Sequence, residues 1–237
     1  MWAHIGRVST YKISEGSRKC VIDRIRTLTI MVFAVSVLLS ACASQATLTR
    51  VIEPSCAYRI ASDWGDTRTP SGKERTIGER YHSGIDFTAP IGTPVRAVAE
   101  GTIEFVRNEY FGGNVVRIYH GQTSAGVHVI SAYAHLHDVL VSVGDRISRG
   151  QVIGTVGMTG RGIDPVAPHL HLAVIETDDP DYPRLSSAAQ YSSGRRVDGK
   201  KYFPRVAETI FMECFEPSKR YEFTDIKFTH PVTILKK

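Results

Sequence analysis

Five side chains that can bind a metal or transfer a proton stand in three short motifs. His82 and Asp86 lie four residues apart in H-S-G-I-D, His135 lies in Y-A-H-L, and His169 and His171 flank one leucine in P-H-L-H. Alternate residues of a strand point to the same side, so the last two imidazoles are expected to face one site. Imidazole and carboxylate donors without a thiolate suit zinc, and a catalytic zinc takes three protein ligands. Such a set leaves two histidines over for acid–base chemistry.

Each motif is weak evidence when it is taken alone, because an isolated histidine on a strand is more often structural or exposed. The three motifs occur together and in order within one segment, and this conjunction favours a metal site. Four other histidines are not assigned to the metal or to acid–base chemistry. His120 is expected to be structural or to support the site, and His128, His137 and His230 are expected to be solvated.

The segment that carries these motifs has the texture of a β domain. Short apolar runs alternate with glycine-bearing turns from about residue 80 to 176, and no helical apolar period is sustained. Many short strands at such spacing predict an all-β fold, an antiparallel sandwich or barrel. Tyr133 is expected to be a packing residue, with a hydrogen bond to the transition state as the alternative. Residues 110–114 and 121–128 are expected to form hairpin loops at the rim of the site.

The flanking segments are interpreted separately. Residues 43–55 read as a tether, residues 56–79 as irregular structure, and residues 177–200 as a long loop with a short helix around 185–191. The tail regains β texture over residues 201–215, 221–228 and 231–235. The predicted organisation is a leader over 1–41, a tether and irregular segment over 42–79, a core over 80–176, and a loop with a β-rich extension packing on the core over 177–237.

The leader has the order of an export signal. Arg24 and Arg26 precede an apolar run over Leu28–Ser40. Thirteen residues give about 20 Å of helix, too short for a hydrocarbon core of about 30 Å, and the small residues that follow are typical of a signal peptide. Leu39-Ser40-Ala41-Cys42 also resembles a bacterial lipobox, in which the cysteine thiol is lipidated. An ordinary signal peptide or a buried apolar helix are the alternatives. In a two-membrane bacterium, Ala43 would favour the outer membrane.

The net charge of +5 is concentrated in this leader. Residues 1–41 hold six of the 29 basic and two of the 24 acidic residues, which leaves 23 basic against 22 acidic residues from Cys42 onward. Phosphate binding needs clustered cations, so nucleic acid is not expected as a partner.

Export also determines how the four cysteines are interpreted. Cys20 would leave with the leader and Cys42 would carry lipid. Cys56 and Cys214 remain, and an oxidising compartment allows them to form a disulfide. Free buried thiols are the alternative. The chain has no C-x-x-C motif, which excludes a cysteine-type zinc finger.

The ordered motifs between Tyr81 and about Glu176 resemble those of the lysostaphin-type (LytM-like) zinc metallopeptidases, which cut peptidoglycan peptides. The resemblance covers H-S-G-I-D, the run A-P-I-G-T-P-V, Y-A-H-L, V-G-D-R-I-S-R-G and P-H-L-H-L. It implies a β-sandwich of the duplicated hybrid motif type and one Zn²⁺ per chain. By position, it makes His82, Asp86 and His171 the metal ligands and His135 and His169 the catalytic histidines. The loop over 161–167 is longer than is usual in the family.

The function implied is zinc-dependent hydrolysis of peptide bonds in peptidoglycan stem peptides or cross-links, performed from a lipid anchor. Within that scheme, His135 is favoured as general base and His169 as the donor to the oxyanion, although the reverse assignment stays open. No glutamate is placed as in H-E-x-x-H, so a helical zincin is excluded. The alternative is a non-hydrolytic protein of the same fold that binds peptidoglycan or activates an amidase. A carrier module on the same sandwich would need no such histidines.

Overall fold

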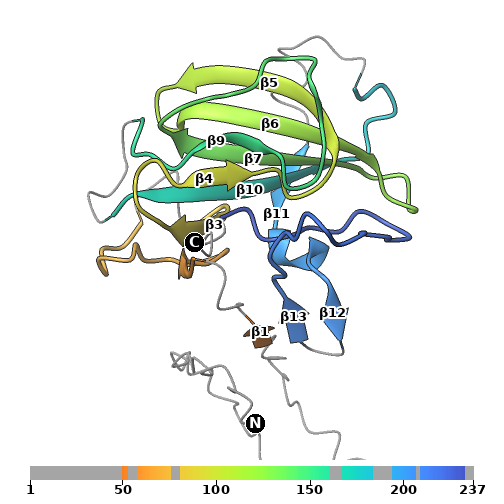
Figure 1. Cartoon of the computed structure of the whole chain (residues 1–237). Helices are drawn as coiled ribbons and strands as arrows, with labels where there is room; N and C mark the ends of the chain where they lie inside the picture. Colours follow the sequence, from red (N-terminus) through yellow and green to blue (C-terminus); the bar gives the residue numbers. More distant parts are fainter. Residues whose placement is uncertain are drawn as a thin grey trace, which may run out of the picture. The chain divides into compact units, whose positions relative to one another are not determined.

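The largest sheet in this computed structural model is an antiparallel sheet of eight strands (Figure 1); the structure describes residues 50–52, 58–75, 81–160, 167–183, 194–206 and 209–232. Seven strands follow the order β2-β3-β10-β7-β6-β5-β8, and β11 pairs with the second half of β10. Their bounds are β2 Ile60–Ser62, β3 Ile85–Thr88, β5 Gly101–Glu109, β6 Gly113–Gln122, β7 His128–Leu136, β8 Arg146–Ile147, β10 His169–Thr177 and β11 Arg195–Val197. The predicted all-β antiparallel class is confirmed.

Two smaller sheets complete the strands. β4 (Pro94–Arg96) pairs with β9 (Val152–Thr155), and both cross one face of the long strands in Figure 1. β1 (Arg50–Ile52) runs parallel to β13 (Thr209–Phe211), which pairs in turn with β12 (Arg205–Val206). Gly199–Tyr202 form a 3-10 helix, η1. Within the described ranges, no helix is long and apolar enough to cross a membrane.

The hydrophobic core lies on the face of the large sheet that β4 and β9 cover. Leu170, Leu172 and Val174 of β10 join Val95 of β4 and Ile153 of β9 in one buried cluster. Because side chains alternate along a strand, this pattern sends His169 and His171 to the opposite face. The apolar side of β10 therefore anchors the strand, while the first half of its other side carries the two histidines and the second half packs Ala173 and Ile175 in a smaller cluster.

Tyr133 belongs to the same cluster and is completely buried. Its hydroxyl accepts a hydrogen bond from the Val98 amide at 2.9 Å and one from Ser131 Oγ at 3.1 Å. The predicted packing role is confirmed, since a buried tyrosine normally finds such partners.

The flanking segments contribute more to the sheets than the sequence indicated. Residues 58–75 are largely irregular, as expected, but β2 pairs with β3. Residues 50–52, expected within a tether, form β1. The strand expected over 221–228 is wrong. There the chain bonds in succession to different elements, from Phe228 N to Tyr202 O and from Thr229 N to Val98 O, so no ladder forms.

The C-terminal extension contributes side chains to the hydrophobic core. Phe203, Phe228 and Val232 are fully buried in the main cluster. Cys214 is disulfide-bonded, but its expected partner Cys56 lies outside the described residues, so that pairing stays a prediction. Cys42 and the helix expected around 185–191 also lie outside the described residues.

Three of the secondary histidines are buried or tied to neighbours. His120 bonds to Glu100 O at 2.6 Å and to Ser131 Oγ at 2.7 Å, which confirms a structural role. His128 and His230 are buried, so the prediction that they are solvated is wrong; His137 is exposed, as expected. His128 is enclosed by the rings of Tyr119 and Tyr182.

His230 should make the fold sensitive to acid. Burial lowers its pKa to about 3, and its Nδ1 accepts a hydrogen bond from the Val232 amide. The unfolded chain binds a proton near pH 6.5 that the folded chain excludes, so stability falls as pH drops from 6.5 toward 3. This group alone should account for about 2 kcal/mol between pH 7 and 5.

His230→Asn retains a side-chain acceptor and should flatten this dependence. Urea unfolding at pH 7, 6 and 5, with chelator present, measures the slope. His137→Asn, at an exposed position, is the matched control and should keep the wild-type slope. Equal slopes in all three proteins would contradict the assignment.

Candidate metal centre

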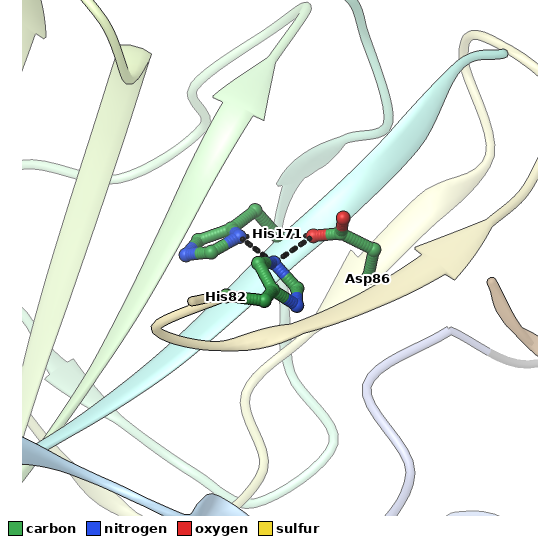
Figure 2. Close-up of side chains that lie close together, drawn as sticks. All are labelled: His82, Asp86 and His171. Atoms are coloured by element: carbon green, nitrogen blue, oxygen red, sulfur yellow. Dashed lines mark hydrogen bonds and ion pairs between the residues drawn. The ribbon is translucent and has the colours of Figure 1, made fainter. Parts of the chain in front are cut away.

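Three donor atoms meet in a nearly equilateral triangle. His82 Nε2 lies 3.0 Å from His171 Nδ1 and 3.0 Å from Asp86 Oδ1, and His171 Nδ1 lies 2.9 Å from Asp86 Oδ1 (Figure 2). Around a tetrahedral zinc with bonds of 2.0–2.1 Å, neighbouring donors are separated by about 3.3 Å. The triangle is therefore close to the size that zinc requires. Each of the three side chains offers one atom that can bind a metal ion, and these atoms are close enough together to share one ion.

The sheet register creates two corners of this triangle. Asp86 of β3 stands directly opposite His171 of β10, and on the other side His171 stands opposite Ala134 of β7. Burial acts to raise the pKa of the Asp86 carboxyl, but hydrogen bonds to His171 and His82 outweigh it and hold this pKa well below its usual range. Asp86 is therefore a carboxylate at neutral pH. Burial lowers the pKa of His171, although the bond to Asp86 opposes this shift.

Hydrogen bonds on the far side of His82 determine its tautomer. Its Nδ1 lies 2.9 Å from the Asp63 carbonyl oxygen and 3.2 Å from Ser62 Oγ. The carbonyl can only accept, and the Ser62 hydroxyl already donates to Asp66 Oδ2 at 3.1 Å. Nδ1 therefore carries the proton, which leaves the Nε2 lone pair directed at the triangle.

Gly84 of H-S-G-I-D provides the space for His171. A Cβ at this position would lie 2.6 Å from both His171 Cε1 and Nε2, and 2.7 Å from the Leu172 carbonyl oxygen. Any side chain here would push the His171 ring or the β10 backbone away. This clearance explains the glycine between the two candidate metal ligands of the motif.

His135 and His169 lie beside the triangle. Their ring centroids are 4.9 Å apart, and the His135 centroid is 5.9 Å from that of His171. His135 Nδ1 contacts the Thr159 carbonyl oxygen at 3.0 Å, and His169 Nδ1 contacts the Ala167 carbonyl oxygen at 3.0 Å. Each Nδ1 must donate, so each Nε2 is available for the reaction. All five residues predicted from the sequence are thus brought together.

His135 is held in an unusual backbone conformation. Its φ is +64°, which is rare outside glycine and costs of order 1–3 kcal/mol. The bond from His135 N to Gly112 O at 2.8 Å supports this conformation. Burial, followed by the nearby His171 and His169, lowers the pKa of His135 to about 4, so its imidazole is neutral at pH 7. Non-glycine residues with such strain cluster at functional sites.

The two predicted hairpin loops have different locations. The turn between β5 and β6 contains Gly112 and therefore borders His135, as expected. The turn between β6 and β7 precedes His128, at the other end of β7 from His135. Its predicted position at the rim is wrong, because a nine-residue strand separates the two. Most of the long loop expected over 161–167 lies outside the described residues.

Sequence reasoning missed the residues that support His82. Ser62 and Asp63 precede it by about twenty positions, and the closer contact is made by a backbone carbonyl, which any residue type could supply. No motif in the sequence marks such a contact. The pairing of β2 with β3 is what places these residues at the site.

Comparison with known proteins finds similarity to peptidases. Residues 80–183 match the model of peptidase family M23. The peptidoglycan DD-endopeptidase ShyA of Vibrio cholerae is 39% identical over 118 residues, which are 50% of this chain and 25% of that protein. The DD-carboxypeptidase/endopeptidase Mpg of Neisseria meningitidis is 42% identical over 120 residues, which are 51% of this chain and 25% of that protein.

The glycyl-glycine endopeptidase ALE-1 of Staphylococcus capitis is 44% identical over 91 residues, or 38% of this chain and 23% of that protein. The solved catalytic domain of lysostaphin from Staphylococcus simulans is 28% identical and covers 59% of this chain and 88% of that chain, with a TM-score of 0.43. The chain spans about a quarter of the length of the curated relatives named above.

Gly84→Ala should remove metal binding without unfolding the protein. The added methyl group must displace the His171 ring or the Leu172 carbonyl, which spoils the triangle. Zinc content after dialysis, measured by atomic absorption, should fall from one ion per chain to a small fraction of that. The exposed Thr102→Ala on β5 is the control. Full zinc occupancy in folded Gly84→Ala would contradict the proposed geometry.

Proposed function

Since residues 80–183 match the model of peptidase family M23, we propose that this chain is a zinc-dependent endopeptidase that hydrolyses peptide bonds in peptidoglycan stem peptides or cross-links. The observation that carries the proposal is the triangle of His82, Asp86 and His171 with two further histidines beside it. Zinc, when bound by these three residues, would supply Lewis-acid polarisation of the scissile carbonyl and acidify a water molecule.

The charges of the three donors suit this metal. Asp86 contributes one negative charge, while His82 and His171 bind through neutral nitrogens, so the site with a dication keeps a net positive charge. A positive site stabilises the negative charge that develops on the carbonyl oxygen during amide hydrolysis. Donor count and type agree with catalytic zinc sites that have three protein ligands.

The hydrogen bonds of His135 suit a general base. Its Nδ1 proton is committed to Thr159 O, so Nε2 presents a lone pair to the site. In the described part of the chain, no carboxylate lies within 4.0 Å of its ring nitrogens. A neutral imidazole in this position can take the proton of the attacking water and return it to the leaving amine.

The surroundings of His169 suit the complementary role. Its Nε2 lies 3.9 Å from Asp86 Oδ1 and therefore points toward the triangle. Because Nδ1 donates to Ala167 O, only Nε2 faces the reacting groups. A protonated Nε2 can donate a hydrogen bond to the tetrahedral oxyanion. The geometry thus favours His135 as base and His169 as oxyanion donor.

The names of the relatives support the choice of substrate. ShyA and ShyC of Vibrio cholerae are DD-endopeptidases, and Mpg is a DD-carboxypeptidase/endopeptidase. A bond that follows a D-residue in a peptide cross-link is therefore the first substrate to test. The glycyl-glycine specificity of ALE-1 is the second.

The leader supports the location that such a substrate requires. Peptidoglycan lies outside the cytoplasmic membrane, and the apolar run Leu28–Ser40 followed by Cys42 has the order of a lipoprotein signal. We therefore place the mature chain on a membrane that faces the cell wall, with the outer membrane favoured in a two-membrane bacterium. Metabolic labelling with palmitate should tag the wild type and leave Cys42→Ser unlabelled, while Cys56→Ser keeps the label.

His135→Gln should separate turnover from metal binding. The variant retains zinc, because His135 is not one of the three ligands, but it should lose at least 10²-fold in the rate of hydrolysis. Residues 43–237 are incubated with peptidoglycan sacculi, and released muropeptides are separated by chromatography. Wild type should convert cross-linked dimers to monomers, and chelator should abolish this conversion.

Two comparisons make this test decisive. His82→Ala should lose both zinc and activity, whereas the exposed His137→Ala should keep both. Wild-type protein that holds zinc and binds sacculi but leaves every muropeptide unchanged would refute hydrolysis. That outcome would favour a non-hydrolytic, amidase-activating protein.

A further inference from the structure

His82 differs from the other two donors in how it is held. Asp86 lies in β3 and His171 in β10, so the hydrogen-bonded ladder of the sheet determines their positions. His82 precedes β3 and lies in no strand. Its ring must therefore be positioned by contacts outside the ladder.

The turn after β2, residues Asp63–Asp66, provides these contacts. His82 N donates to Asp66 O at 2.8 Å, and Gly65 N donates to His82 O at 2.8 Å, so the backbone is bonded in both directions. The Asp63 carbonyl oxygen accepts from His82 Nδ1 at 2.9 Å. A shift of this turn would rotate the ring and move Nε2 away from the triangle.

Lys200 fixes this turn from the opposite end of the chain. Its ammonium group lies 2.5 Å from Asp63 Oδ2, and its side chain is only 14% exposed. The other carboxylate oxygen, Oδ1, accepts from the Trp64 amide at 2.7 Å. The whole Asp63 carboxylate is thus engaged, and Lys200 is the partner that comes from outside the turn.

Lys200 is itself well anchored through η1. Asp198 caps the helix by accepting a bond from Lys200 N at 3.0 Å. Gly199 lies against β10, where a Cβ would approach Val174 Cγ2 to 2.7 Å, and the Tyr202 hydroxyl bonds to the buried Glu176 of β10. The same strand that carries His171 therefore also supports the residue that fixes the turn beside His82.

We propose that Lys200 and Asp63 are positioning residues for the metal ligand His82. Both lie outside residues 80–183, so segments on both sides of the family-matching region complete the metal centre of this chain. This inference rests on the zinc binding proposed above, but not on hydrolysis of peptidoglycan. Residues that orient a metal-binding histidine typically change metal affinity by 10- to 100-fold when they are replaced.

Lys200→Met tests the proposal directly. The substitution keeps the length of the stem and removes the charge, so the Asp63 turn loses its outside partner. Zinc affinity, measured by competition with a chromophoric chelator, should weaken by about 10- to 100-fold. Lys200→Arg, which keeps the ion pair, should bind zinc nearly as tightly as wild type. Asp63→Asn should weaken zinc as Lys200→Met does, and the double variant should be no weaker than either single one.

Lys201→Met is the matched control, because it removes the same charge from the next residue of η1. Lys201 pairs with Glu176 rather than with the turn, so its loss should lower the unfolding temperature without changing zinc affinity. Should Lys200→Met fail to fold, Asp63→Asn, of nearly unchanged size, decides the question. Wild-type zinc affinity in both variants would overturn the positioning role alone, whereas failure of the wild type to bind zinc would overturn the proposed function as well.

Discussion

The antiparallel register between β3 and β10 is the constraint on which the site depends. It sets Asp86 opposite His171 and Thr88 opposite His169, and a slip of one residue would turn both histidines into the core. The apolar side of β10 opposes such a slip, because Leu170, Leu172 and Val174 are all buried in the main cluster. The hydrophobic face of one strand thereby determines which polar groups meet on its other face.

A buried cluster of acceptors is unfavourable by itself, and the fold compensates for it in several ways. The three atoms that could bind a metal all carry lone pairs, so they would repel one another if none were protonated. The Asp86 carboxylate is also largely removed from water. Carbonyl oxygens hold the protons of His82, His135 and His169 on Nδ1, away from the centre. The strained backbone of His135 and the clearance at Gly84 belong to the same arrangement. These features support the cation site proposed for this centre.

The sequence was sufficient to predict which candidate residues gather at the site, since alternation along a strand placed His169 and His171 on one face and the family resemblance supplied the other three. It was insufficient wherever a contact depended on the backbone or on a distant segment. The Asp63 carbonyl has no signature in the residue type, and Lys200 lies 137 positions from Asp63. His128 and His230 look like surface residues in the sequence, but the strand pairing and the returning C-terminal segment bury them. Their burial follows from the tertiary arrangement, which local patterns do not contain.

The boundary of a family match and the boundary of a working site need not coincide in such a fold. Within residues 80–183, the hydrogen-bonded ladder of the sheet positions Asp86 and His171. The contacts that orient His82 come from residues outside this range. Those come from the turn after β2 and from η1, which is tied to β10 through Glu176. His82 lies in no strand, so the position of its ring must be determined by the segments that pack against it. In this chain the supports are the charged side chains of Asp63 and Lys200, so the proposed positioning role would make the flanking segments part of the metal centre.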